Sequence, residues 1–98
     1  MAYLAYNYIS SGDKLTTNGS NQTIFNTPTN TNTIIAQFNI WTTTDCHVDI
    51  YNSSGKITTY YIPAYNTIPI VSLANPLPVT SVKIQENLTT YIFWGQTR

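Results

Sequence analysis

Apolar residues along this chain alternate with polar ones or stand in short blocks, and no segment repeats them at helical spacing. Ile, Thr, Tyr and Val, which fit a pleated surface, dominate these blocks. The pattern therefore predicts an all-β chain of short strands. The predicted strands are residues 3–9, 14–17, 22–25, 33–41, 45–51, 56–62, 67–71, 81–86 and 88–94.

Turn-forming residues between these blocks predict three hairpins. Asn18-Gly19 joins 14–17 to 22–25, the group 52–55 joins 45–51 to 56–62, and Asn87 joins 81–86 to 88–94. Prolines around and within 67–71 restrict that segment to an edge strand or a crossover between sheets.

Alternation also assigns side chains to faces. Residues 33–41 have apolar side chains on both faces, Phe38 and Ile40 on one and Trp41 on the other, which is typical of a central strand. The aromatic segment 88–94 is expected to close a core. In 45–51 the inward side chains are Cys46, Val48 and Ile50, and the outward ones are Asp45, His47, Asp49 and Tyr51.

Short strands separated by regular turns are typical of an antiparallel β-sandwich, either immunoglobulin-like or jelly-roll. A small β-barrel is the alternative. Ninety-eight residues without a repeat or linker fit a single domain, residues 1–98.

Composition narrows the range of functions. Only 8% of the residues are charged and four acids balance four bases, so a basic surface for nucleic acid is not expected. An uncharged Thr- and Asn-rich exterior suits a protein held in an assembly, although AT-rich codons alone produce the same composition. No apolar stretch is long enough to cross a membrane, and the N-terminus lacks the features of a signal peptide.

Catalytic and metal chemistry are not expected. Asp45, His47 and Asp49 share one face of one strand, where side chains are spaced too widely for a compact metal site, so we expect a hydrated polar face. Cys46 and His47 point to opposite faces and cannot form a nucleophile and base. We therefore expect neither a cofactor nor an enzyme.

Aromatic residues beyond the needs of a small core offer contact area with a polar handle. The candidate interface residues are Tyr3, Tyr6, Tyr8, Tyr60, Tyr61 and Tyr65. Packing in the core is the alternative for each of them. Residues 1–9 could form an intersubunit strand, or could instead pair within their own sheet.

The hairpin-rich chain, its uncharged surface and the segment Ser81-Val82-Lys83-Ile84-Gln85-Glu86-Asn87-Leu88-Thr89-Thr90-Tyr91 resemble small tailed-bacteriophage virion proteins, such as capsid decoration proteins and head-fibre or tail modules. The resemblance implies an accessory structural protein of the virion. Such a protein docks as a homo-oligomer on the major capsid protein or another virion protein, without catalysis.

A rival hypothesis from another class is a carbohydrate-binding module or adhesin tip. The two differ in how they use the aromatic side chains. A virion protein buries its tyrosines and N-terminal segment against neighbouring subunits, whereas a carbohydrate-binding module exposes a few rings with Asn and Asp beside them.

Overall fold

The computed structural model describes residues 7–27, 34–72 and 79–97. These ranges contain strands and no helix, and so no helix that could span a membrane. The strands are β1 (Asn7–Ser10), β2 (Leu15–Thr16), β3 (Gln22–Asn26), β4 (Ile35–Thr42), β5 (Cys46–Asn52), β6 (Gly55–Ile62), β7 (Ile68–Val71), β8 (Ser81–Ile84) and β9 (Thr90–Thr97).

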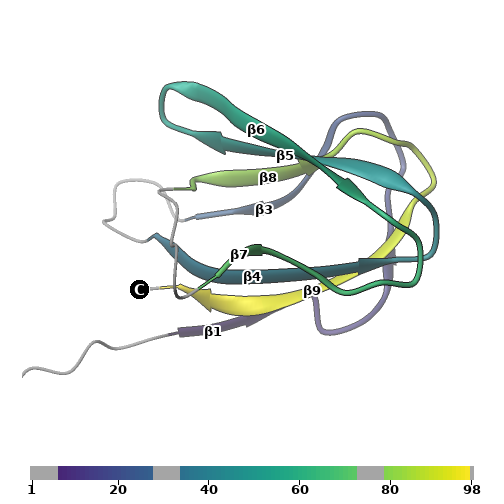
Figure 1. The fold of residues 1–98 in the computed structure, drawn as a ribbon, viewed down its shortest axis with the longest axis horizontal. Coiled ribbons are helices and arrows are strands. Elements are labelled where there is room, and N and C mark those ends of the chain that lie inside the picture. The colour runs from purple at the N-terminus through teal and green to yellow at the C-terminus, as the bar shows by residue number, and fades with distance from the viewer. Residues whose placement is uncertain (1–6, 28–33, 73–78, 98) are drawn as a thin grey trace, which may run out of the picture.

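The strands form two antiparallel sheets packed face to face (Figure 1). Sheet A has the order β1-β9-β4-β7, with the short β2 also pairing with β9, and sheet B has the order β3-β8-β5-β6. The predicted β-sandwich is therefore confirmed. The alternative of a small barrel is wrong, because the sheets are not closed on one another.

The pairing is nested around the middle of the chain. β5 pairs with β6, β4 with β7, β3 with β8, and β1 and β2 with β9. Among the nine strands, β1 and β2 share sheet A, β5 and β6 share sheet B, and every other connection crosses between the sheets, as when one long hairpin is wrapped around a core. This is the jelly-roll topology, so the immunoglobulin-like alternative is wrong.

Two of the three predicted hairpins are wrong for the same reason. β2 and β3 lie in different sheets, as do β8 and β9, so the turns between them carry the chain across the sandwich. The third hairpin, β5–β6, is confirmed, with Asn52 opposite Gly55. The prediction for residues 67–71 is also confirmed, because β7 lies at the edge of sheet A after crossing from sheet B.

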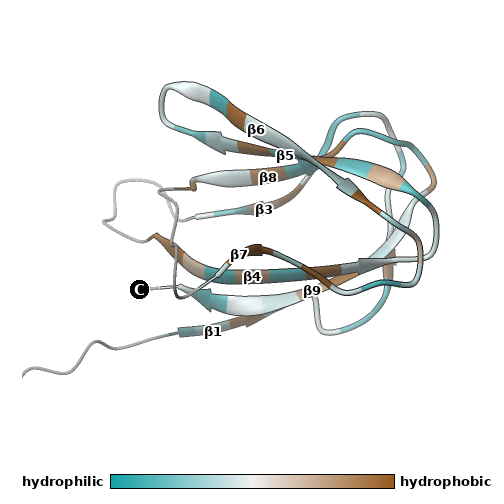
Figure 2. Cartoon of the chain, viewed as in Figure 1, coloured by the Kyte–Doolittle hydropathy of each residue, from teal (hydrophilic) through white to brown (hydrophobic). Residues whose placement is uncertain are grey.

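Alternation along the strands places one apolar face of each sheet in a shared core, and Figure 2 shows hydrophobic and hydrophilic bands alternating along β4. The predicted inward residues Cys46, Val48 and Ile50 are all buried. Phe38 and Phe93 stack at 5.0 Å between ring centroids, which joins β4 to β9. Apart from Ala36, the buried apolar residues of the described ranges form one cluster between the sheets.

Candidate binding surface

The outer face of sheet A collects side chains that the core does not use. Phe93 and Tyr91 of β9 are buried, so Ile92, Trp94 and Gln96 project outward from the same strand. On β4, Phe38 and Ile40 point inward, and the intervening Asn39 and the following Trp41 point outward.

Four aromatic residues on this side of the protein are called the aromatic face here: Tyr8, Trp41, Tyr65 and Trp94. Tyr8 lies on β1 beside the inward Ile9, and Tyr65 lies in the turn between β6 and β7. Tyr8 and Tyr65 are 71% and 69% exposed, and both tryptophans are half-buried. The two tryptophans of the chain therefore share one face of one sheet.

Trp41 is flanked on two sides. The ring of Tyr65 approaches it edge to face, with 5.8 Å between centroids, and the ammonium of Lys14 lies 5.3 Å from the centre of the indole. Tyr65 reaches this position with a positive φ of 62°, held by its N–H, which donates to the carbonyl of Thr42 at 2.8 Å. A bulky residue rarely adopts this conformation, so the turn determines where the ring lies.

No strand of sheet A contains a charged residue. Its outward polar side chains are instead amides and hydroxyls. Asn39 lies opposite Trp94, and Gln37 lies opposite Gln96 in the β4–β9 register. Amides both donate and accept hydrogen bonds. This surface therefore combines aromatic rings with uncharged groups that can act as donor or acceptor.

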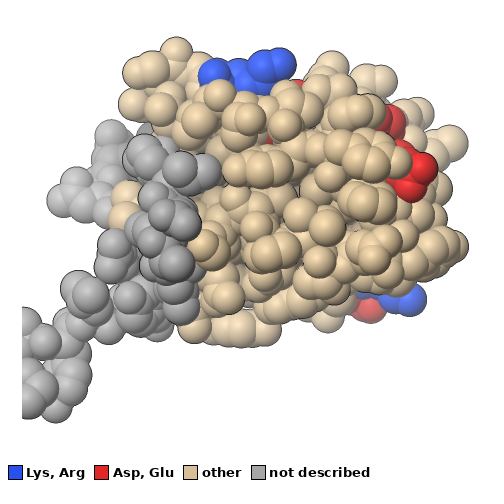
Figure 3. Space-filling model, in the orientation of Figure 1, with Lys and Arg blue, Asp and Glu red and all other residues tan. Residues whose placement is uncertain are grey.

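The outer face of sheet B differs in charge. Its strands contain His47, Asp49, Lys56 and Lys83, and the ammonium of Lys83 lies 4.7 Å from the ring centre of Tyr51. On the side of the molecule shown in Figure 3, most of the surface is uncharged, and small charged groups lie on the side of sheet A as well as on that of sheet B. Within residues 7–27, 34–72 and 79–97, every charged residue that lies in a strand thus belongs to sheet B, although Lys14, just before β2, reaches Trp41 on sheet A.

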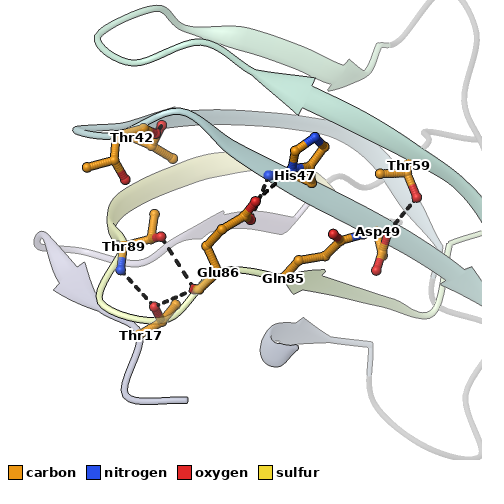
Figure 4. Close-up of polar contacts among 9 residues, drawn as sticks. Thr17, Thr42, His47, Asp49, Thr59, Gln85, Glu86 and Thr89 are labelled. Carbon is orange, nitrogen blue, oxygen red and sulfur yellow. Dashed lines mark hydrogen bonds and ion pairs between the residues drawn. The ribbon is translucent and has the colours of Figure 1, made fainter. Parts of the chain in front are cut away.

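The prediction that Asp49 lies on a hydrated face is wrong, because it is only 3% exposed. Its Oδ1 accepts hydrogen bonds from Thr59 Oγ1 at 2.5 Å and Gln85 Nε2 at 2.9 Å (Figure 4). These donors come from β6 and from the residue after β8, so β5 is covered on its outer face by both neighbours. Alternation gave the correct face, but the side chains of neighbouring strands bury the carboxylate.

His47 is exposed, as predicted, and pairs with Glu86. Its Nδ1 lies 2.6 Å from Glu86 Oε2, and its backbone N–H donates to Oε1 at 2.8 Å (Figure 4). Partial burial opposes ionisation of Glu86, but the hydrogen bonds from His47 outweigh it and hold the pKa of this carboxyl below its ordinary value. Glu86 lies in the turn between β8 and β9. Its backbone carbonyl accepts a hydrogen bond from Thr17 Oγ1 at 2.9 Å, which connects this turn to the segment after β2.

Asp45 lies directly before β5, two residues from His47. Its Oδ1 accepts the N–H of Ala64 at 2.8 Å, and this bond, with a second from the Tyr61 hydroxyl, lowers the pKa of Asp45. The same contact raises the pKa of Tyr61. The crossover that presents Tyr65 is therefore anchored at Ala64 by a carboxylate of the β4–β5 turn.

Reactive groups do not converge in the described part of the chain. Cys46 is buried in the core, where desolvation raises the pKa of its thiol to about 11, and His47 lies on the opposite face. Among residues 7–27, 34–72 and 79–97, no three His, Cys, Asp or Glu side chains are grouped to hold a metal. No pocket opens on this part of the surface either. The outer face of sheet A, with its rings, its amides and the ammonium of Lys14 beside Trp41, is thus the chemically most distinctive surface.

The six predicted interface tyrosines have different surroundings. Tyr3 and Tyr6 lie outside the described residues; Tyr8, Tyr61 and Tyr65 are exposed; and Tyr60 is partly buried against the core. Tyr61 and Tyr65 do not form one cluster, because Tyr61 packs beside His47 on sheet B whereas Tyr65 contacts Trp41 on sheet A. Of residues 1–9, Asn7 to Ile9 pair with β9 in their own sheet, and residues 1–6 lie outside the described ranges.

The sequence did not single out Trp94 or Trp41 as surface residues. The signal was available, since Tyr91 and Phe93 alternate with Ile92 and Trp94, and only one of the two sets can face the core. Comparisons with protein-family models, curated proteins and solved structures found no match to this chain.

Proposed function

We propose that the chain is a non-catalytic binding module that recognises a neutral carbohydrate through the aromatic face. The observation that supports this most directly is the segregation of charge, because every strand of sheet A is uncharged and its outer face combines indole and phenol rings with amides. Sugar rings have apolar C–H faces that stack on aromatic rings, and their hydroxyls both donate and accept hydrogen bonds, as amides do.

Ionic ligands fit this surface poorly. A nucleic acid or an anionic polysaccharide requires several cations along its path, and among the described residues Lys14 alone is a cation beside the aromatic face. Jelly-roll domains occur in both lectins and viral capsids, so the fold alone does not choose between these functions. The chemistry of the outer face is what favours a sugar.

Intrinsic fluorescence provides the test, since both tryptophans lie on the aromatic face. Titration with soluble neutral glucans, mannans and galactans should quench or shift the emission saturably with at least one of them. The response should persist in high salt, because little of the interaction is ionic. Tyr51→Ala is the matched control, since it removes a half-buried ring that lies beside Lys83 on the opposite sheet. The proposal is rejected if no neutral glycan changes the emission.

The β1 edge favours a second function, that of an accessory virion protein that docks on an assembled capsid and decorates or stabilises it. Three sheet edges have features that discourage strand addition: Pro69 in β7, bulges in the β3–β8 and β5–β6 pairs, and Lys56 in β6. The register of β1 with β9 is unbroken, and β1 contains no proline or charge.

The peptide groups of β1 alternate in direction. The Ser11 N–H donates to the Phe93 carbonyl, so Ile9 and Asn7 also bond to β9, and the peptide groups of Tyr8 and Ser10 point away from it. A strand of a capsid protein or of a second copy could pair there. Ser10→Pro removes one outward N–H and should abolish co-sedimentation with assembled tailed-phage capsids and any self-association. Binding unchanged in this variant argues against the edge.

A further inference from the structure

We infer that the aromatic face binds its carbohydrate as an extended chain laid diagonally across sheet A, and not as a single terminal sugar. This inference rests on the proposed carbohydrate-binding function and adds the direction and minimum length of the ligand. It follows from the register of three strands and the position of one turn.

The strand register places three rings on one diagonal. Trp41 of β4 lies opposite Ile92, Trp94 of β9 lies two residues further along, and Tyr8 of β1 lies opposite Gln96, two residues further again. Each step moves one strand sideways and two residues along the sheet. Such diagonal neighbours are about 7–8 Å apart, so the line from Tyr8 to Trp41 spans roughly 15 Å.

Tyr65 extends the line beyond β4. Its ring contacts Trp41, and its turn leads into β7, which lies on the other side of β4 from β9 and Trp94. The contact of the Tyr65 N–H with Thr42 and that of Ala64 with Asp45 fix this turn at two adjacent positions. Four rings thus follow one path from the β1 edge to the opposite edge of the sheet.

Amide side chains flank this path at matching intervals. Gln96 and Gln37 lie level with Tyr8, and Asn39 lies level with Trp94. The Nδ2 of Asn39 approaches the carbonyl of Trp94 at 3.5 Å, which orients the amide beside the ring. Rings that stack on sugar faces would therefore have hydrogen-bonding groups within reach of the equatorial hydroxyls.

The shape of the surface favours a polymer over a chain end. A terminal sugar is usually enclosed in a concave site, and no pocket opens on the described part of this surface. On an open face each sugar contacts about one ring, so affinity must accumulate over several of them. A proline-rich peptide is a less suitable occupant, because such segments dock in aromatic grooves.

The test is a fluorescence titration with the neutral glycan that binds best, offered as a series from monosaccharide to hexasaccharide. Affinity should rise at least tenfold from disaccharide to hexasaccharide, which corresponds to about 1.4 kcal/mol. Two variants shorten the line at its ends. Tyr8→Ser removes one terminal ring, and Tyr65→Asn removes the other while suiting the positive φ at that position.

Each shortened variant should lose about 2- to 10-fold in affinity for the hexasaccharide and little for the disaccharide, whereas Tyr51→Ala on sheet B should change neither. A monosaccharide that binds as tightly as the hexasaccharide overturns the extended-chain inference and leaves the proposed function intact. Binding of a proline-rich peptide with no response to any glycan overturns both.

Discussion

Replacing Asp49 tests how much a buried carboxylate contributes to the stability of the fold, a feature that the strands of sheet A lack. In Asp49→Ala, Thr59 and Gln85 lose the charged acceptor that they share. A hydrogen bond to a charged group contributes about 1.5–3 kcal/mol. Two such bonds set the upper limit of the stability that is lost. Thr59 is exposed and Gln85 is half-buried, so after the substitution both donors can form hydrogen bonds with water instead.

Removing the carboxylate also removes its desolvation cost, and the net loss expected is therefore about 2 kcal/mol. This is a large share of the roughly 5–15 kcal/mol that stabilises a domain of this size, and it corresponds to a fall in melting temperature of about 8–16 °C. Urea unfolding followed by tryptophan emission measures it, because both tryptophans lie on the other sheet, away from the substitution.

Two further variants separate burial from charge. Asp49→Asn keeps an acceptor at Oδ1 and should lose about half as much as Asp49→Ala. His47→Ala removes a neighbour on the same strand whose side chain is 47% exposed, and an exposed ion pair contributes at most about 1 kcal/mol. The reasoning fails if Asp49→Ala costs less than about 0.5 kcal/mol, the value typical of a surface position.

Three other predictions follow from the strands and their titratable groups. A Cβ on Gly95 would clash with the backbone carbonyl of Gln37, so Gly95→Ala should destabilise the fold by about 3 kcal/mol or more in urea unfolding. A neutral result would contradict the close approach of β4 to β9. The raised pKa of Cys46 means that the folded state retains this proton more tightly than the unfolded state. Stability should therefore fall between about pH 9 and 11, less so in Cys46→Ala, and iodoacetamide should label the native thiol slowly. The lowered pKa of Glu86 has the opposite sign, so its stabilisation should be lost as the pH falls below about 4.5, and Glu86→Gln should flatten that acid limb of a urea-midpoint series.

Strand positions followed from local pattern, but strand partners did not. Asn87 and Leu88 form a genuine turn, with Leu88 at a positive φ of 55°. A turn residue shows that the chain reverses, yet it does not show whether the next strand returns to the same sheet. That choice depends on distant strands, because β8 fits between β3 and β5 while β9 fits between β1 and β4.

The candidate site was predictable to a similar extent. Tyr8 and Tyr65 were expected as contact residues, and both are exposed. Trp94 was assigned with its neighbours to the core, because an aromatic run contains no polar residue to mark its outer face. The diagonal of rings depends on the β4–β9 and β1–β9 registers, and these join residues that are far apart in the sequence.

The central place of β9 has a consequence for the order of folding. It separates β1 from β4 and pairs with both, so sheet A has no continuous hydrogen bonding until the last strand is present. During synthesis the β5–β6 hairpin can form early, because its strands are adjacent in sequence. One edge of β4 stays unpaired until β9 has left the ribosome, and non-local pairing of this kind makes folding slow. The edges of β1 and β4 that pair with β9 are therefore unprotected until β9 has been made, and exposed strand edges are what a chaperone would protect.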